Sequence, residues 1–147
     1  MATLEQIGAK MGTLQGNIDS NNVEIGRLEK SYNSLLQLKG KVERQREVFY
    51  SAKRSKENAL TAVGAVSKNS IVAKNYYNGM KKLLSETGNK ITNIVFALLL
   101  EKIKNELNSI RNKISSCEQN IRNAERSLER AKKDYKKEKE RLNNIKN

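Results

Sequence analysis

A chain of 147 residues with 37% hydrophobic but only 5% aromatic residues has too few bulky side chains for a thick globular core. It contains no proline, the residue that ends helices and shapes loops, so long uninterrupted helices are expected. Its net charge of +13 favours an acidic partner but does not choose between nucleic acid, anionic lipid and an acidic protein face. We expect a single all-α domain over residues 1–147.

The first predicted helix covers about residues 3–63. Steps of alternately three and four residues mark out a line of fourteen positions, of which eleven are apolar. They are Leu4, Ile7, Met11, Leu14, Ile18, Asn21, Ile25, Leu28, Tyr32, Leu35, Lys39, Val42, Arg46 and Phe49. Such a line is the seam of a coiled coil, and its polar members typically fix the register of the pairing.

The segment from about residue 64 to residue 79 is predicted to be a turn. Gly64 and Gly79 bound it, and it is rich in serine and asparagine, with Ser67, Lys68, Asn69 and Ser70 in one run. A turn centred near residue 72 would bring Phe49 close to Phe96. The two helices would then form one antiparallel hairpin.

The second predicted helix covers about residues 80–145, and from residue 100 onward thirteen of its fourteen seam positions are apolar. These positions are Leu100, Ile103, Leu107, Ile110, Ile114, Cys117, Ile121, Ala124, Leu128, Ala131, Tyr135, Glu138, Leu142 and Ile145. A strict seven-residue repeat of this length indicates a left-handed coiled coil. We therefore predict a long antiparallel two-helix hairpin, with a parallel coiled coil between separate chains as the alternative.

One stretch of the second helix is too apolar for a single seam. Residues 94–100 are all apolar and must point around the whole helix, whereas one facing helix covers only about a third of it. Either a small local core or an exposed surface for another helix would explain this, and we favour the exposed surface. Its predicted partner-binding residues, with those expected opposite on the first helix, are Val48, Phe49, Tyr50, Ile94, Val95, Phe96, Leu98, Leu99 and Leu100. Leu35, Leu36 and Leu38 could extend this face.

The residues that usually carry catalysis or metal binding are scarce. The chain has no histidine and a single cysteine, so neither the common zinc ligand sets nor a Ser–His or Cys–His pair can be assembled. Its glycines match neither of the common phosphate-binding motifs. We expect no enzymatic activity, no cofactor, no metal and no small-molecule substrate. Cys117 lies in the seam, which predicts a buried and inert thiol.

The basic run over residues 126–141 raises the possibility of nucleic-acid binding. Acidic residues are interleaved with the bases, and aromatic residues for base stacking are nearly missing. A solvated helix face is the favoured interpretation, and nucleic acid is the less favoured partner.

The beginning of the chain has no basic segment followed by an apolar one, so no classical signal peptide is predicted. The longest apolar run has seven residues, far fewer than the roughly 20 that span a bilayer. We expect a cytoplasmic protein that does not insert into a membrane.

A heptad helix, a turn of small residues and the sequence Tyr76-Tyr77-Asn78-Gly79-Met80 at the start of a second heptad helix form a recognisable layout. It resembles the WXG superfamily of small helical hairpins handled by type VII secretion, and most closely its YwqH-like branch, encoded beside LXG toxins in Gram-positive bacteria. The resemblance covers nearly the whole chain. Tyr77 and Gly79 would correspond to the Trp-x-Gly of the family's turn, although the tryptophan is missing here.

The resemblance implies an accessory or targeting protein, similar to a chaperone. Such a protein binds the helical LXG domain of a toxin, often with a second small helical protein, and promotes the toxin's export. The family's YxxxD/E signal has no counterpart after the second helix, since Lys139 lies four residues after Tyr135. It is open whether this chain is exported with the toxin. A self-associating structural coiled coil is the alternative function.

Overall fold

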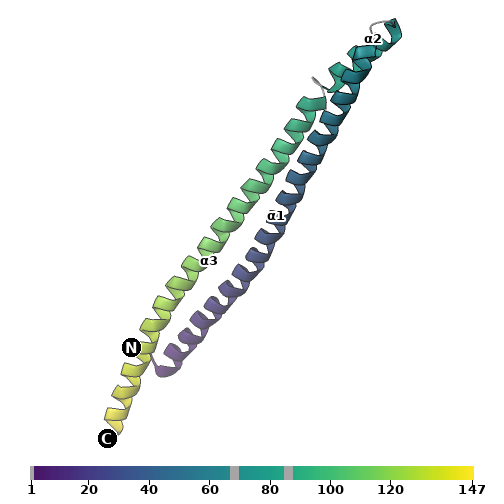
Figure 1. The fold of residues 1–147 in the computed structure, drawn as a ribbon. Helices are drawn as coiled ribbons and strands as arrows, with labels where there is room; N and C mark the ends of the chain where they lie inside the picture. Colours follow the sequence, from purple (N-terminus) through teal and green to yellow (C-terminus); the bar gives the residue numbers. More distant parts are fainter. Residues whose placement is uncertain (1, 67–69, 85–87) are drawn as a thin grey trace. The chain divides into compact units, whose positions relative to one another are not determined.

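The computed structural model describes residues 2–66, 70–84 and 88–147. Within these ranges the elements are helices alone: α1 (Leu4–Val66), α2 (Ile71–Lys82) and α3 (Gly88–Lys146) (Figure 1). The long helices α1 and α3 pack together. The predicted all-α class is confirmed.

A reciprocal cap begins α1. The Thr3 hydroxyl oxygen accepts a hydrogen bond from the Gln6 backbone N–H at 3.2 Å, and the Gln6 side-chain oxygen accepts one from the Thr3 N–H at 3.0 Å. This capping box satisfies two donors that the first turn leaves without partners. From there α1 continues for 63 residues, as the absence of proline allows.

The segment expected to be a turn is largely helical. Residues 71–82 form α2, α1 continues to Val66, and α3 begins at Gly88 instead of near residue 80. The Ser70 hydroxyl accepts a hydrogen bond from the Ala73 N–H at 3.3 Å and so caps α2, and asparagine and glycine weaken a helix without ending it as proline does. The predicted turn residues Ser67, Lys68 and Asn69 lie outside the described residues.

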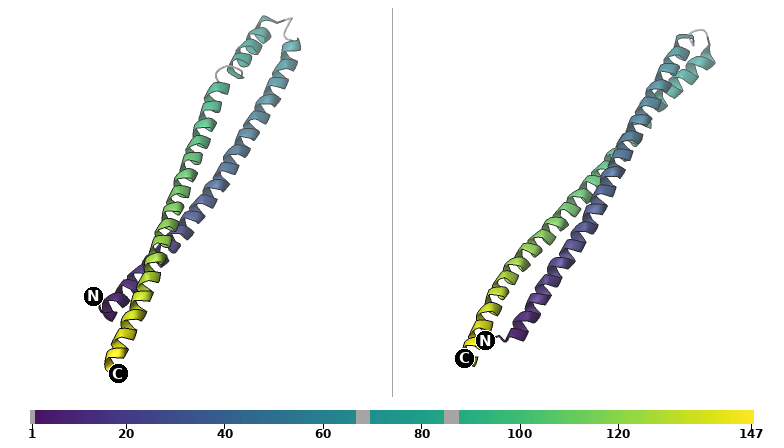
Figure 2. Two further views of the ribbon diagram at one scale, coloured as in Figure 1. Left: turned by 90° about the vertical axis from the view of Figure 1, so that its left-hand side faces the viewer. Right: turned by 60° about the horizontal axis from the view of Figure 1, so that its bottom comes forward.

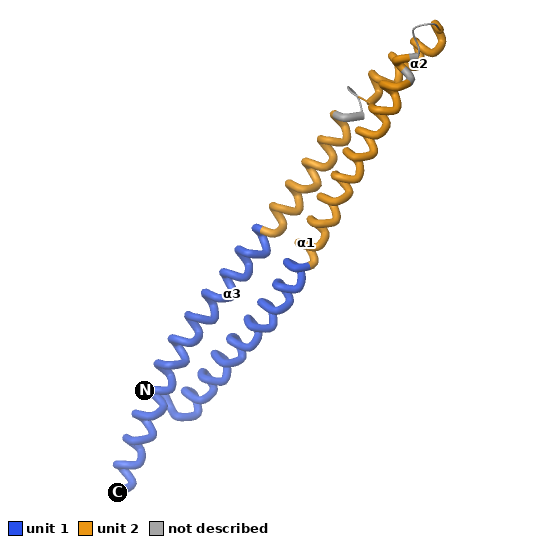
Figure 3. Tube along the Cα trace, viewed as in Figure 1, with its two compact units in different colours: residues 1–33, 108–147 blue, residues 34–107 orange. Residues whose placement is uncertain are grey.

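The chain divides into two compact units, where the sequence suggested one domain (Figure 3). Unit 1 comprises residues 1–33 and 108–147, and unit 2 comprises residues 34–107. Each unit contains a segment of α1 and a segment of α3, and α2 belongs to unit 2.

Unit 1 is held by the predicted seam. Its segments of α1 and α3 run side by side in opposite directions (Figure 2). The core cluster consists of Ile18, Ala124 and Leu128, with Met11, Leu14 and Ile121 packed against it. Cys117 lies on the same line but is only half-buried, less than predicted, because the interface between two helices is one side chain deep.

The polar seam residues of unit 1 bond within their own helices. The Asn21 amide donates to the carbonyl oxygen of Asn17 at 2.8 Å, and Glu138 accepts from Arg141. A polar contact between the helices is made by another seam residue, Tyr32, whose hydroxyl accepts a hydrogen bond from Arg111 at 2.6 Å. These bonds of Asn21 and Glu138 do not themselves join the two helices.

In unit 2 the inward-facing residues change their spacing. On α1 the half-buried positions Phe49, Lys53 and Glu57 follow one another in steps of four. On α3 the half-buried positions Thr92, Phe96 and Leu100 do the same. Two successive steps of four form a stutter, which locally unwinds a coiled coil. This stutter is the physical basis of the phase slip in the sequence, and it occurs on both helices around the contact between Phe49 and Phe96.

A close contact between Gly64 and Tyr77 packs α2 on α1. A Cβ atom added to Gly64 would lie 2.6 Å from Cε2 of Tyr77, which is closer than real Cβ contacts come. At Gly79, in contrast, an added Cβ would meet nothing within 4 Å. The Tyr77 ring therefore occupies space that only glycine leaves free at residue 64.

The seam of unit 1 can be tested by Ile18→Ala. Ile18 is buried in the core cluster, so its truncation should lower the free energy of unfolding by about 2 kcal/mol or more in urea denaturation. The control Val23→Ala changes a side chain that is 75% exposed on the same helix, and should change stability by no more than about 0.5 kcal/mol. Equal effects would contradict the assigned seam.

The packing of α2 can be tested by Gly64→Ala, with Gly79→Ala as the control. Both replacements raise helix propensity by about 1 kcal/mol, so Gly79→Ala should stabilise the protein. Gly64→Ala should gain less or lose stability, because the Tyr77 ring must move. Thermal unfolding measures the difference. Nuclear Overhauser contacts between residue 64 and the Tyr77 ring should weaken in Gly64→Ala alone, and unchanged contacts would refute the packing.

Candidate docking surface

The apolar run over residues 94–100 divides between two faces of α3. Phe96 and Leu100 are half-buried and lie on the inner line of unit 2. Ile94, Val95 and Leu98 are more than half exposed, and Leu99 is exposed by 40%. The run therefore contributes both to the seam and to an outer surface, which combines the two interpretations that the sequence left open.

Four of the outer residues form a stripe along α3. Ile91, Ile94, Val95 and Leu98 have exposed fractions of 59%, 56%, 55% and 65%. Their spacing of i, i+3, i+4 and i+7 is that of the anchors by which one amphipathic helix recognises another. We call these four residues the α3 stripe. Ile91 was not among the predicted site residues, although its position three residues before Ile94 could have indicated it.

The predicted site residues on α1 lie opposite this part of α3. The rings of Phe49 and Phe96 have centroids 6.2 Å apart, which confirms the predicted proximity. The Tyr50 hydroxyl donates a hydrogen bond to the side-chain oxygen of Asn93. Phe49 and Tyr50 are thus used within the chain, whereas Val48 is 60% exposed.

Tyr77 and Gly79 both lie on α2, not in a turn. Tyr77 is half-buried against Gly64, and the Lys81 ammonium lies 5.8 Å from the centroid of its ring. Gly79 is exposed. Tyr77 therefore helps to hold α2 on α1, and the neighbouring Tyr76 is the exposed aromatic residue.

Exposed apolar side chains are concentrated in unit 2. Among the described residues, fourteen large hydrophobic side chains are exposed, and all but Val23 and Ile145 belong to unit 2. Leu36 and Leu38 are among them, whereas Leu35 is half-buried. The buried hydrophobic residues show the opposite distribution, since only Val42, Ile103 and Leu107 of the ten described belong to unit 2. Unit 2 therefore contains most of the exposed apolar side chains, and unit 1 contains most of the buried ones.

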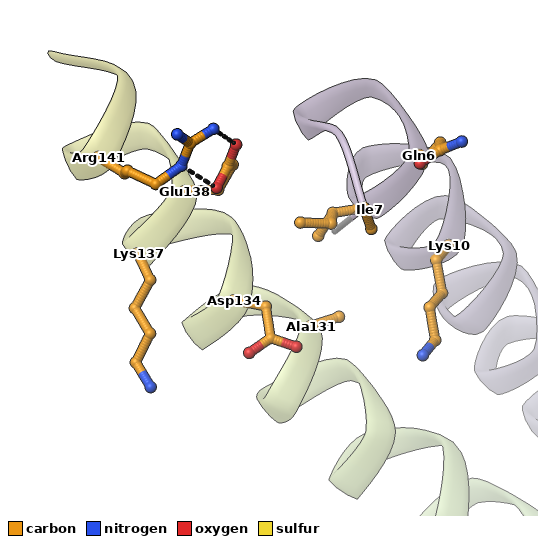
Figure 4. A pocket seen from close by; sticks show the side chains of 9 residues that line it. Gln6, Ile7, Lys10, Ala131, Asp134, Lys137, Glu138 and Arg141 are labelled. Atoms are coloured by element: carbon orange, nitrogen blue, oxygen red, sulfur yellow. Dashed lines mark hydrogen bonds and ion pairs between the residues drawn. The ribbon is translucent and has the colours of Figure 1, made fainter. Parts of the chain in front are cut away.

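Unit 1 contains a hollow of about 510 Å³ between the start of α1 and the end of α3 (Figure 4). Ile7 and Ala131 lie at its base, and Lys10, Asp134 and Glu138 are among the charged residues around it. Arg141 donates two hydrogen bonds to Glu138, at 2.7 and 2.9 Å. This hydrogen bond lowers the pKa of Glu138 below its ordinary value, and the charge of Arg141 adds to the effect. The mixture of both charge signs favours no single class of ligand.

Within residues 2–66, 70–84 and 88–147, no three histidine, cysteine or acidic residues come together as a metal site would require. Over the same residues, no helix combines the length and the apolar character needed to cross a membrane. No protein-family model, curated protein or solved structure matches the chain. The exposure and spacing of its four residues make the α3 stripe the candidate site.

The pairing of Glu138 with Arg141 can be tested by Arg141→Gln. Loss of the charged hydrogen bond should raise the pKa of Glu138 toward its ordinary value, as measured by carboxyl-carbon NMR during titration. Because folding lowers this pKa, the pair stabilises the protein above the unfolded-state pKa, and the stabilisation is lost as the pH falls through the folded-state pKa. The pKa of Glu24, lowered in the same way by Arg27, is the control and should not change. An unchanged pKa at Glu138 would refute the pairing.

Proposed function

We propose that this chain is a non-enzymatic accessory protein that binds a helical partner through the α3 stripe. The supporting observation is the i, i+3, i+4, i+7 spacing of four side chains that are each more than half exposed. Soluble proteins rarely leave such apolar surface uncovered unless something binds there. The exposed Val48 on α1 adds to this surface.

The partner we propose is the LXG domain of a type VII secretion toxin, with a second small helical protein as a further component. This choice comes from the resemblance to the YwqH-like branch of the WXG superfamily. In this proposal the two long helices are the arms of one antiparallel hairpin, and α2 belongs to the segment that joins them. The chain would hold the toxin's helical domain in the cytoplasm and promote its export.

The physical role of the complex would be to cover apolar surface on both proteins. Helical LXG segments that need a partner would otherwise expose their own apolar faces and aggregate. A partner that binds the folded toxin domain also stabilises it by mass action. Both effects would keep the toxin in a state that the secretion machinery can accept.

Co-expression with an LXG-domain toxin from the same genome tests the proposal. The two proteins should co-purify, and Leu98→Asp should abolish co-purification by placing a charge in the apolar contact. The control is Ala97→Asp, which adds the same charge at the preceding residue of α3, also exposed but outside the stripe.

The proposal fails if the two proteins do not co-purify and the toxin is stable and exported without this chain. It also fails if Leu98→Asp and Ala97→Asp bind equally well. Light scattering of the chain alone provides an independent measurement. A structural coiled coil would self-associate as its concentration rises, whereas a dedicated accessory protein should remain a monomer.

A further inference from the structure

The two flanks of the helix pair in unit 2 differ in chemistry. The hydrogen bond between Tyr50 and Asn93 marks one flank, which we call the polar flank. In a helix of 3.6 residues per turn, successive residues are rotated by about 100°, so residues two positions apart are rotated by about 160° in the shorter sense. Val48 precedes Tyr50 by two positions, and Val95 follows Asn93 by two. Both valines therefore belong to the opposite flank, which we call the apolar flank.

The apolar flank includes residues of both helices at one level. Val48 and Val95 are each one residue away from the phenylalanines whose rings meet, Phe49 and Phe96. By the same rotation, Ala52 joins Val48 on α1, and Ile91 and Leu98 join Val95 on α3. These five apolar residues are all exposed. A third helix lying against both α1 and α3 on this flank would cover them together.

The charged residues around the apolar flank are mainly basic. Lys41 and Lys102 are nine positions from Tyr50 and Asn93 respectively, a rotation of about 180°, so both lie on the apolar flank. Lys56 is rotated from Tyr50 by about 120°, which also places it on the side of the apolar flank. All three lysines are exposed. Among the described acidic residues of unit 2, Glu106 alone lies on this side.

Of the remaining described acidic residues of unit 2, Glu57 belongs to the inner line and the other three lie on the polar flank. Glu43 and Glu47 are rotated from Tyr50 by at most about 60°, and Glu101 from Asn93 by about 80°. Arg54, Lys90 and Lys104 accompany them there, and the seam residues Lys39 and Arg46 are rotated toward the same flank. Unit 2 has fourteen basic and six acidic residues in its sequence, a surplus of +8, and its apolar flank has few acidic residues to offset the lysines.

We propose that the apolar flank takes a single amphipathic helix whose apolar stripe is bordered by aspartate and glutamate, completing a three-helix arrangement. The lysines at its two ends, Lys41 and Lys56, are fifteen residues apart, which corresponds to about 22 Å or four helical turns. This inference rests on the proposed function and specifies the chemistry of the partner's surface. Opposite charges along the edges would set the direction of the bound helix and speed its association.

The test uses three peptides of about 20 residues with the same leucine stripe and with glutamate, glutamine or lysine at the flanking positions. Their binding to the full chain is measured by fluorescence anisotropy. The acidic peptide should bind at least about tenfold more tightly than the basic one at low salt, a difference that should shrink as salt screens the charges.

Variants of the chain locate the binding face. Val48→Asp should abolish binding, which shows that α1 contributes beside the α3 stripe. The double variant Lys41→Glu with Lys102→Glu should reverse the preference from the acidic to the basic peptide. Its matched control, Arg54→Glu with Lys104→Glu, changes the net charge equally on the polar flank and should keep the preference for the acidic peptide.

The proposal is overturned if acidic and basic peptides bind alike, or if both double variants change the preference equally. It is also overturned if the flank binds a second copy, seen as a dimer in sedimentation equilibrium that Val48→Asp dissociates. The two proposals fail separately. An LXG domain that co-purifies regardless of the lysine reversal refutes only the acidic helix, whereas acidic-peptide binding without LXG binding refutes only the assigned partner.

Discussion

A helix that packs against one other helix can bury only about a third of its circumference. This geometric limit governs the whole chain, because within each unit the long helices have few neighbours with which to share apolar side chains. A sequence built for this arrangement must confine its apolar residues to one line and make the other faces polar. Unit 1 follows that rule closely, and its buried residues all belong to the seam.

Unit 2 departs from the rule in two ways that belong together. Its inner line includes Lys53 and Glu57, which pair with each other at 3.5 Å, while apolar residues such as Ile91 and Leu98 lie outside. Compared with a simple coiled coil, unit 2 therefore has charged side chains on its inner line and apolar side chains on its outer faces. A chain selected only for a stable helix pair would have the reverse distribution. This distribution is the basis of the proposal that unit 2 binds a partner.

The seam, the helical class and the proximity of Phe49 to Phe96 could be predicted from the sequence, because heptad spacing reports directly which residues share a face. The helix α2 could not be predicted, because glycine and asparagine are common in turns. The segment nevertheless contains no proline, and the cap at Ser70 allows a helix to begin there. The apolar run over residues 94–100 was identifiable as excess, but its division between inner and outer faces depends on the local spacing of four. This spacing of four on α3 could be recognised only in the structure, where the facing segment of α1 has the same spacing.

The small number of buried apolar residues in unit 2 should lower its local stability. Beyond Val42 on α1 and before Ile103 on α3, unit 2 has no buried hydrophobic residue among those described. Backbone amides there should exchange with solvent deuterium through local opening, at a lower free energy than amides beside Ile18 or Leu128. A helix bound on the apolar flank would supply the missing burial and slow this exchange. Binding of the partner would then stabilise the part of the chain that is least stable on its own.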